Sequence, residues 1–324
     1  MNSAADDWRW MGAALALASR GVGVATPNPS VGCVLVKEGR VIGRGWTQAG
    51  GRPHAEAMAL AQAGTAARGA TAFVTLEPCA HQSPRGSACA DSLIAAGVAR
   101  VVIAAHDPDP RTDGDGAARL AAAGIAVAQG VRAAEAEAGL AGFLTRLQLG
   151  RPHMTLKLAV SLDGAIAMGD GRSQWITGER ARAAAHLARA RNDLIVVGRG
   201  TWDADAPRLD VRLQGLEARS PRIGVVGRGD GLPNHVQHIP DLAALCADPA
   251  LNLLVEGGMG LAASLLGADL VDTLLLHRAP ILIGAGRTLG DIGLTDMAGA
   301  HCRWAAAAAM VLGPDRIERY TRIR

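Results

Sequence analysis

Three side chains able to bind a metal, His54, Cys79 and Cys89, occur within the first third of the sequence, and Glu56 closely follows the histidine. One imidazole and two thiolates form the mixed nitrogen and sulfur ligand set that zinc favours. Three protein ligands leave one tetrahedral position for a water molecule, and zinc lowers the pKa of that water from about 15.7 to roughly 7. Glu56 is then placed to move the proton of this water without binding the metal itself.

The elements expected around these residues position them for that chemistry. Residues 55–63 are rich in Ala, Leu and Met and predict a helix, so that His54 and Glu56 lie at its first turn. A short strand is predicted over 72–76, and it leads directly into the loop that carries Cys79. The ends of these two elements therefore supply the imidazole, the carboxylate and the first thiol.

Cys89 stands directly before a predicted helix over 90–96, and a helix N-terminus lowers the pKa of a cysteine thiol. The order His-x-Glu followed by Pro-Cys is the first half of the signature of zinc nucleobase deaminases. Residues 80–88, between the two cysteines, form a longer segment than the two residues of that signature. His81 in this segment is the candidate for a fourth ligand, and a zinc site closed by it would indicate a non-catalytic binding protein instead.

Length and composition disfavour several classes of protein. With 324 residues, the chain is long enough for two domains. A net charge of +3 and an aromatic content of 3% do not favour a nucleic-acid surface, and no apolar run reaches the length of a membrane span. The five cysteines lack the spacing of a disulfide framework, and Asp6 and Asp7 replace the basic start of a signal peptide. We therefore expect a cytoplasmic protein with no nucleic-acid and no membrane partner.

Strand and helix patterns alternate through both halves of the chain, which predicts an α/β fold in each half. In the first half, residues 31–37 and 41–45 predict a hairpin with Gly39 at its turn, and the alternation predicts a largely parallel sheet covered by helices, with a last long helix over 133–149. Gly150-Arg151-Pro152 is the expected linker. The predicted domains are therefore residues 1–149 and residues 150–324.

A glycine-rich turn in the second half indicates a second chemistry. Gly258, Gly260 and Ala263 match the spacing of the dinucleotide-binding fingerprint, between a predicted strand over 251–255 and a predicted helix over 260–266. The N-terminus of that helix would offer unpaired N–H groups to a phosphate. An ordinary tight turn between a strand and a helix has the same glycines, so both interpretations stay open.

Several longer segments together resemble the bifunctional deaminase–reductase family of riboflavin biosynthesis, over nearly the whole chain. The segments are 26–33, 75–81, 107–110, 156–164 and 173–177. The last two match the hallmarks of the reductase half and have no counterpart in general deaminases. The resemblance implies a cytidine-deaminase-like α/β/α domain at residues 1–149 and a dihydrofolate-reductase-like α/β domain at residues 150–324.

The resemblance also implies an activity and the residues that carry it. The reaction is hydrolytic deamination of 2,5-diamino-6-(5-phosphoribosylamino)pyrimidin-4-one, a small-molecule substrate, followed by NADPH reduction of its ribosyl chain to ribityl. Implied ligands of Zn²⁺ are His54, Cys79 and Cys89, with Glu56 as the catalytic proton carrier. Implied NADPH contacts are Ala159, Trp175, Thr201, Asp205, Gly258, Met259, Gly260, Leu261, Ala262, Ala263 and Ser264. Implied substrate contacts are Asn28, Ser173, Arg189, Leu209, Arg212 and Glu256.

Two segments depart from the family pattern, and two rival functions stay open. Residues 83–88 replace the usual loop before Cys89 and are one residue longer, and residues 205–212 lack one of the family's paired acids. The rivals are a tRNA base deaminase with an unrelated C-terminal domain and a reductase whose first domain is only a scaffold. We expect a homo-oligomer. Lys157 and Asp163 are the candidates for the proton donor of the reductase.

Overall fold

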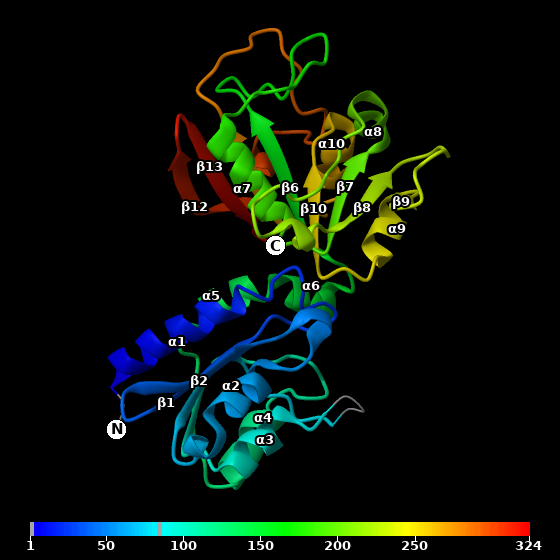
Figure 1. The fold of residues 1–324 in the computed structure, drawn as a ribbon. Coiled ribbons are helices and arrows are strands. Elements are labelled where there is room, and N and C mark those ends of the chain that lie inside the picture. The colour runs from blue at the N-terminus through cyan, green and yellow to red at the C-terminus, as the bar shows by residue number, and fades with distance from the viewer. Residues whose placement is uncertain (1–2, 83–85) are drawn as a thin grey trace. The chain divides into compact units, whose positions relative to one another are not determined.

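The computed structural model describes residues 3–82 and 86–324 and contains two compact units, Met1–Leu149 and Gly150–Arg324. We call them the N-terminal and C-terminal units and describe each by itself (Figure 1). Both are α/β, as the alternation of patterns predicts. Within the described residues, no helix combines the length and the apolar character that crossing a membrane requires.

The N-terminal unit is built on a five-stranded sheet in the order β2-β1-β3-β4-β5. Its strands are β1 (Gly32–Lys37), β2 (Arg40–Trp46), β3 (Thr71–Leu76), β4 (Arg100–Ala105) and β5 (Ala126–Gln129). Only β3, β4 and β5 are parallel, because β1 is antiparallel to both β2 and β3. The expectation of a largely parallel sheet is therefore wrong for this half. The hairpin predicted over 31–45 forms, with Glu38 and Gly39 as a two-residue turn at φ values of 50° and 72°, whereas the antiparallel pairing of β1 with β3 had no signal in the hydrophobic pattern.

In the described part of this unit, six α-helices cover the two faces of the sheet (Figure 1). They are α1 (Ala4–Ala18), α2 (Ala55–Ala63), α3 (Cys89–Ala96), α4 (Asp115–Ala122), α5 (Ala133–Gly139) and α6 (Ala141–Leu149). Helices α1 and α5 contact each other on one face, whereas α2 contacts β1, β2 and α3 on the other. The single helix expected over 133–149 is interrupted at Leu140, whose ψ of 6° lies outside the helical range. The core contains the inward residues of the strands, with Phe73, Leu35 and Ile103 fully buried.

The C-terminal unit has an eight-stranded sheet in the order β12-β13-β11-β6-β10-β7-β8-β9. Its strands are β6 (His153–Val160), β7 (Leu194–Gly198), β8 (Arg222–Val226), β9 (Val236–Ile239), β10 (Asn252–Glu256), β11 (Thr273–Arg278), β12 (Trp304–Leu312) and β13 (Asp315–Arg322). The six strands from β11 to β9 in this order are parallel, and β13 and β12 continue the sheet in antiparallel fashion. Parallel strands meet at a common C-terminal edge, where ligands of α/β sheets bind.

Helices lie on both faces of this second sheet. They are α7 (Glu179–Arg189), α8 (Arg199–Asp205), α9 (Leu242–Ala247) and α10 (Met259–Gly267). On one face, Leu265 of α10 packs with Leu156 of β6, and on the other face Ala188 of α7 packs with Leu254 of β10. The sequence patterns missed α8, α9 and β9. Helix α8 buries none of its residues, so it has no apolar periodicity to detect.

Candidate functional site

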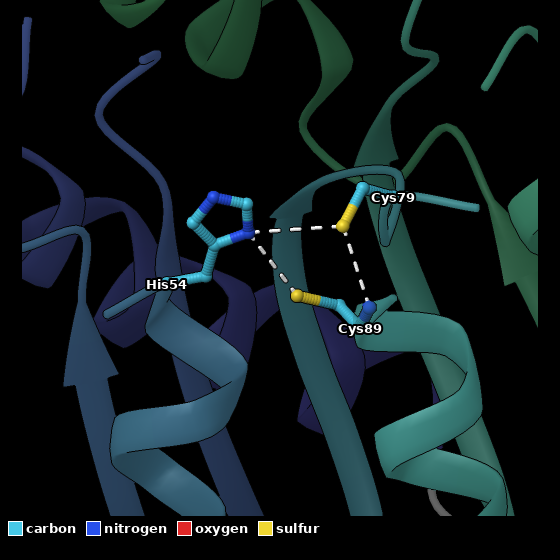
Figure 2. A group of neighbouring side chains, drawn as sticks. All are labelled: His54, Cys79 and Cys89. Atoms are coloured by element: carbon cyan, nitrogen blue, oxygen red, sulfur yellow. Dashed lines mark hydrogen bonds between the residues drawn. The ribbon is translucent and has the colours of Figure 1, made fainter. Parts of the chain in front are cut away.

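The three predicted metal ligands converge in the N-terminal unit (Figure 2). Nδ1 of His54 lies 3.3 Å from Sγ of Cys89 and 3.7 Å from Sγ of Cys79, and all three ligand atoms lie within 4.8 Å of one another. Zinc bonds of about 2.0 Å to nitrogen and about 2.3 Å to sulfur place tetrahedral ligands roughly 3.6–3.8 Å apart. The observed separations therefore fit a tetrahedral zinc site.

Each ligand sits at the end of a regular element. His54 is the extended residue that precedes α2, Cys79 follows β3 in a buried loop, and Cys89 is the first residue of α3. The backbone N–H of Cys89 donates to Sγ of Cys79 at 3.3 Å. Hydrogen bonding between the two thiol groups lowers the pKa of Cys79 and raises that of Cys89. The loop thus already favours one thiolate, which is the form that binds a metal.

The cluster has three members among the described residues, and His81 is not one of them. His81 is half-buried, and its Nδ1 is enclosed without a hydrogen-bond partner in the part of the chain that the structure describes. A site closed by His81 is therefore not supported, and the geometry favours an open fourth position. The replaced loop before Cys89 begins with residues 83–85, which lie outside the described residues.

Glu56 lies in the first turn of α2, is 3% exposed and is not part of the ligand cluster. Burial raises the pKa of its carboxyl group, and the nearby His54 opposes this effect. A carboxyl group with a raised pKa takes up and releases a proton nearer to neutral pH. The position and environment of Glu56 therefore suit a proton carrier beside the metal.

Asn28 reaches the opposite side of the His54 ring. Its Nδ2 donates to the carbonyl of Gly51 at 2.9 Å and lies 2.9 Å from Nε2 of His54. Gly51 has a φ of 84°, and a Cβ atom there would lie 2.7 Å from Cγ of Asn28. A residue without a side chain is thus needed at position 51 for Asn28 to approach the metal-binding histidine.

Glu77 is a residue of this site that sequence reasoning missed. Its buried carboxylate accepts hydrogen bonds from the backbone N–H groups of Gly114 at 3.2 Å and Ala117 at 3.0 Å, and His106 lies 3.1 Å away. These bonds hold the start of α4 against Glu77, which lies two residues before the ligand Cys79. The available signal was an acidic residue directly after a mostly apolar, buried strand, where an unpaired charge would be costly.

A second polar cluster lies at the C-terminal edge of the parallel strands in the C-terminal unit. Glu256 ends β10 and pairs in register with Lys157 of the neighbouring strand β6. Arg189 of α7 makes a two-pronged ion pair with Glu256, at 2.7 and 2.8 Å, and donates to the carbonyl of Asp210 at 2.9 Å. Two predicted substrate contacts, Arg189 and Glu256, are thus bonded to each other beside Lys157.

The glycine-rich turn lies next to this cluster, directly after Glu256. Gly257 and Gly258 have φ values of 70° and 80°, and α10 begins at Met259. A Cβ atom on Gly258 would lie 2.7 Å from Oγ1 of Thr201 in α8, so the turn and Thr201 are close neighbours. The backbone N–H groups of the first turn of α10 have no partner within the helix and suit a phosphate.

The remaining predicted contacts of the C-terminal unit occupy varied environments. Leu261 and Ala262 are core residues, so only their backbone is available to a ligand, and Leu209 is buried at a φ of 53°. Asp205 ends α8, Ala159 lies in β6, Met259, Gly260, Ala263 and Ser264 belong to α10, and Nε of Arg212 lies 3.5 Å from Asp210. Ser173 and Trp175 precede α7, and they make no hydrogen bond or ion pair with the Arg189–Glu256 pair within the described ranges. Trp175 is 65% exposed and stacks under Arg182.

The two candidate proton donors differ sharply. The Asp163 carboxylate accepts hydrogen bonds from Ser161 and from the backbone N–H of Gly284, and these bonds lower its pKa. Asp163 is therefore ionised and stabilises a loop through its hydrogen bonds. An ionised carboxylate is a poor proton donor. Burial lowers the pKa of Lys157, while Glu256 acts in the opposite direction. Lys157 is thus the better candidate.

Comparisons with known proteins cover both units. The family model of the cytidine and deoxycytidylate deaminase zinc-binding region matches residues 4–105, and the model of the RibD C-terminal domain matches residues 152–315. The riboflavin biosynthesis protein RibD of Escherichia coli K12 is 40% identical over 328 residues, covering 86% of this chain and 89% of the relative. RibD of Mycobacterium tuberculosis H37Rv is 38% identical over 323 residues, covering 94% of each.

Solved structures give the same result. RibD of Acinetobacter baumannii, in form 1, is 34% identical with a TM-score of 0.90, covering 99% of this chain and 100% of that one. A Thermotoga maritima structure is 28% identical with a TM-score of 0.88, covering 98% and 99%. It bears the name diaminohydroxyphosphoribosylaminopyrimidine deaminase/5-amino-6-(5-phosphoribosylamino)uracil reductase.

These matches test the expected folds of the two units and the expected family of the chain. The cytidine-deaminase-like N-terminal fold and the dihydrofolate-reductase-like C-terminal fold are confirmed. A tRNA base deaminase with an unrelated C-terminal domain gains no support, because residues 152–315 match the RibD C-terminal domain. The chain belongs to the RibD family of riboflavin biosynthesis proteins.

Proposed function

We propose that this chain is a bifunctional deaminase and reductase of riboflavin biosynthesis. Residues 1–149 form the deaminase domain, and residues 150–324 form the reductase domain. The substrate is 2,5-diamino-6-(5-phosphoribosylamino)pyrimidin-4-one, which loses its ring amine by hydrolysis before its ribosyl chain is reduced. The observation that carries this proposal is the cluster of three metal ligands beside a buried, non-ligand Glu56.

In the deaminase domain, His54, Cys79 and Cys89 hold zinc. The bound ion supplies an acidified water, so that hydroxide is available near neutral pH. Glu56 would accept a proton at the metal site, pass it to the ring nitrogen and then carry a second proton to the leaving amine. Water and the substrate amine thus become a ring carbonyl and ammonia, and Asn28 contacts the pyrimidine beside His54.

In the reductase domain, bound NADPH would supply the hydride that reduces the first carbon of the opened sugar. Lys157 gives a proton to the ring oxygen as the sugar opens, and the Arg189–Glu256 pair orients the substrate together with Ser173, Leu209 and Arg212. The turn at 258–264 would hold the phosphates of the dinucleotide. The unpaired N–H groups at the start of α10 support this placement. Further NADPH contacts are Ala159, Trp175, Thr201 and Asp205.

The protein is cytoplasmic and forms a homo-oligomer. The support for self-association is the edge strand β12, in which Met310 is 55% and Val311 73% exposed. A long apolar edge strand is a site for pairing with another chain. Light scattering of the purified protein is expected to give a mass above that of one chain, and a monomer at all concentrations would contradict this.

The direct test feeds the purified protein the diaminopyrimidinone phosphate and follows ammonia and NADPH separately. Ammonia is expected without NADPH, and NADPH oxidation only after ammonia has formed. Release of no ammonia, combined with NADPH oxidation when the deaminated substrate is supplied, would favour a reductase whose first domain is a scaffold. Ammonia release without any NADPH oxidation would contradict the proposed reductase.

A further inference from the structure

His277 on β11 is a buried histidine that the proposed mechanism does not use. Its side chain is 1% exposed, and both ring nitrogens are enclosed without a hydrogen-bond partner among residues 3–82 and 86–324. The backbone of Ala181 in α7 faces the ring and acts to raise the pKa of His277 as a hydrogen-bond partner would, although no hydrogen bond of standard geometry forms. A buried polar group left without a partner costs free energy, so such groups are rare in folded proteins.

Strand register places His277 beside the reductase cluster. His277 pairs with Ala159 of β6, and Lys157 lies two residues earlier on the same face of that strand. Glu256 pairs with Lys157 from the other side, on β10. Lys157 is therefore flanked by a carboxylate on one neighbouring strand and by an imidazole on the other, and diagonal neighbours of this kind are within reach of a long side chain.

We propose that His277 is a positioning residue of the reductase, which holds the Lys157 side chain in place while that side chain gives up its proton. This inference rests on the proposed function of Lys157. Glu256 is already bonded through both oxygens to Arg189, so it is not a dedicated partner for Lys157. Among the described residues, His277 is a neighbouring group whose ring nitrogens make no hydrogen bond of standard geometry, so the ring can still bond to Lys157.

An imidazole suits this role because it can serve both protonation states of the lysine. A neutral imidazole has one N–H donor and one acceptor nitrogen. It can accept from the Lys157 ammonium before proton transfer and donate to the Lys157 amine afterwards. Burial lowers the pKa of His277 to about 4, and the charge of Lys157 acts in the same direction, so the ring is neutral at physiological pH.

The charged and titratable groups found on this face among the described residues are His153 and Lys157 of β6, Glu256 of β10, His186 and Arg189 of α7, and Asp315 and Arg319 of β13. The Asp315 carboxylate accepts a hydrogen bond from the backbone N–H of Gly178 at 2.7 Å. The pH response of His277 variants is therefore expected to report on Lys157, with Glu256 and Arg189 as its charged neighbours.

The test compares His277→Leu with His277→Gln in the full-length protein, using the deaminated phosphoribosylaminouracil and NADPH. Leu removes both nitrogens, and we expect kcat to fall about 10- to 100-fold with little change in KM for NADPH. The alkaline limb of the pH profile should move to lower pH, because the Lys157 ammonium loses an acceptor. Gln retains a donor and an acceptor and should keep most of the activity. Ammonia release, from the other domain, should be unchanged in both variants.

The melting temperature of His277→Leu distinguishes a positioning role of His277 from a role in core packing. Replacing an unsatisfied buried polar group by an apolar one is neutral or stabilising, so His277→Leu should leave the melting temperature unchanged or raise it while activity falls. In a Lys157→Ala background, His277→Leu should cause no further loss.

Wild-type kcat and an unchanged pH profile in His277→Leu would overturn the inference, as would a full additional loss in the Lys157→Ala background. If His277→Leu does not fold, a folded but inactive His277→Gln would overturn it. A wild-type protein that never oxidises NADPH would instead overturn the proposed reductase, before any variant is compared.

Discussion

The metal centre and the reductase cluster are assembled in different ways. His54, Cys79 and Cys89 come from one short stretch of chain, and each stands at the end of a helix or strand. Lys157, Glu256 and His277 are far apart in the sequence and meet only through the register of adjacent parallel strands. The first arrangement can be recognised from local motifs, whereas the second exists only once the sheet has formed.

The largest expected effect tests whether the metal centre stands apart from the reductase. Cys89→Ala removes one of three ligands, so zinc binding and ammonia release should both be lost. NADPH oxidation with the deaminated substrate should persist, because the reductase cluster lies in the other unit. Metal analysis and the two assays measure this, with Cys302→Ala as the control because Cys302 is an exposed free cysteine outside the cluster. Retained zinc in Cys89→Ala would remove Cys89 from the ligand set.

Glu56→Gln sharpens the comparison within the metal centre. The substitution keeps the shape of the side chain but removes its ability to carry a proton. Ammonia release should fall by about 10²- to 10⁴-fold while zinc remains bound. Ammonia release per bound zinc is the measurement. Deamination at the wild-type rate in this variant would exclude Glu56 as the proton carrier.

Glu256→Gln tests the reductase cluster. Arg189 and Glu256 have side chains only 12% exposed, so the substitution leaves a mostly buried guanidinium without its anion. We expect a loss of about 3–5 kcal/mol in the unfolding free energy of the C-terminal unit, together with loss of NADPH oxidation. Denaturant unfolding measures the first effect.

Asp203→Asn is the matched control for this ion pair. Asp203 is 53% exposed in its pair with Arg199, so its loss should cost less than about 1 kcal/mol. If Glu256→Gln and Asp203→Asn lost the same unfolding free energy, the buried ion pair would contribute no more to stability than the exposed one.

A smaller effect is expected on acidification. Burial lowers the pKa of His153 to about 4, although the nearby Asp272 opposes this. The unfolded chain therefore binds a proton at His153 between about pH 6.5 and pH 4 when the folded chain does not, and stability falls as the pH drops through this window. His153→Asn should remove up to about 3 kcal/mol of that fall. Unfolding free energies at pH 7 and pH 4.5 measure it, and an identical decline in both proteins would contradict the assignment.

Local sequence signatures were enough to single out His54, Cys79 and Cys89, which the structure brings together, and to predict the α/β character of both halves and most strands. They did not predict that β1 is antiparallel to β3, since hydrophobic pattern does not report strand direction. Helix α8 was missed because it buries nothing. The role of Glu77, the Arg189–Glu256 bond and the place of His277 beside Lys157 depend on tertiary contacts that no local pattern encodes.

The proposed deaminase activity depends most on a zinc ion that keeps one position free for water. A crystal structure of the purified protein with zinc bound tests this most directly, through the anomalous signal of the metal. The expected result is zinc bonded to Nδ1 of His54 and to Sγ of Cys79 and Cys89, with a water molecule as the fourth ligand. A fourth bond to His81 or to any other side chain would contradict the account.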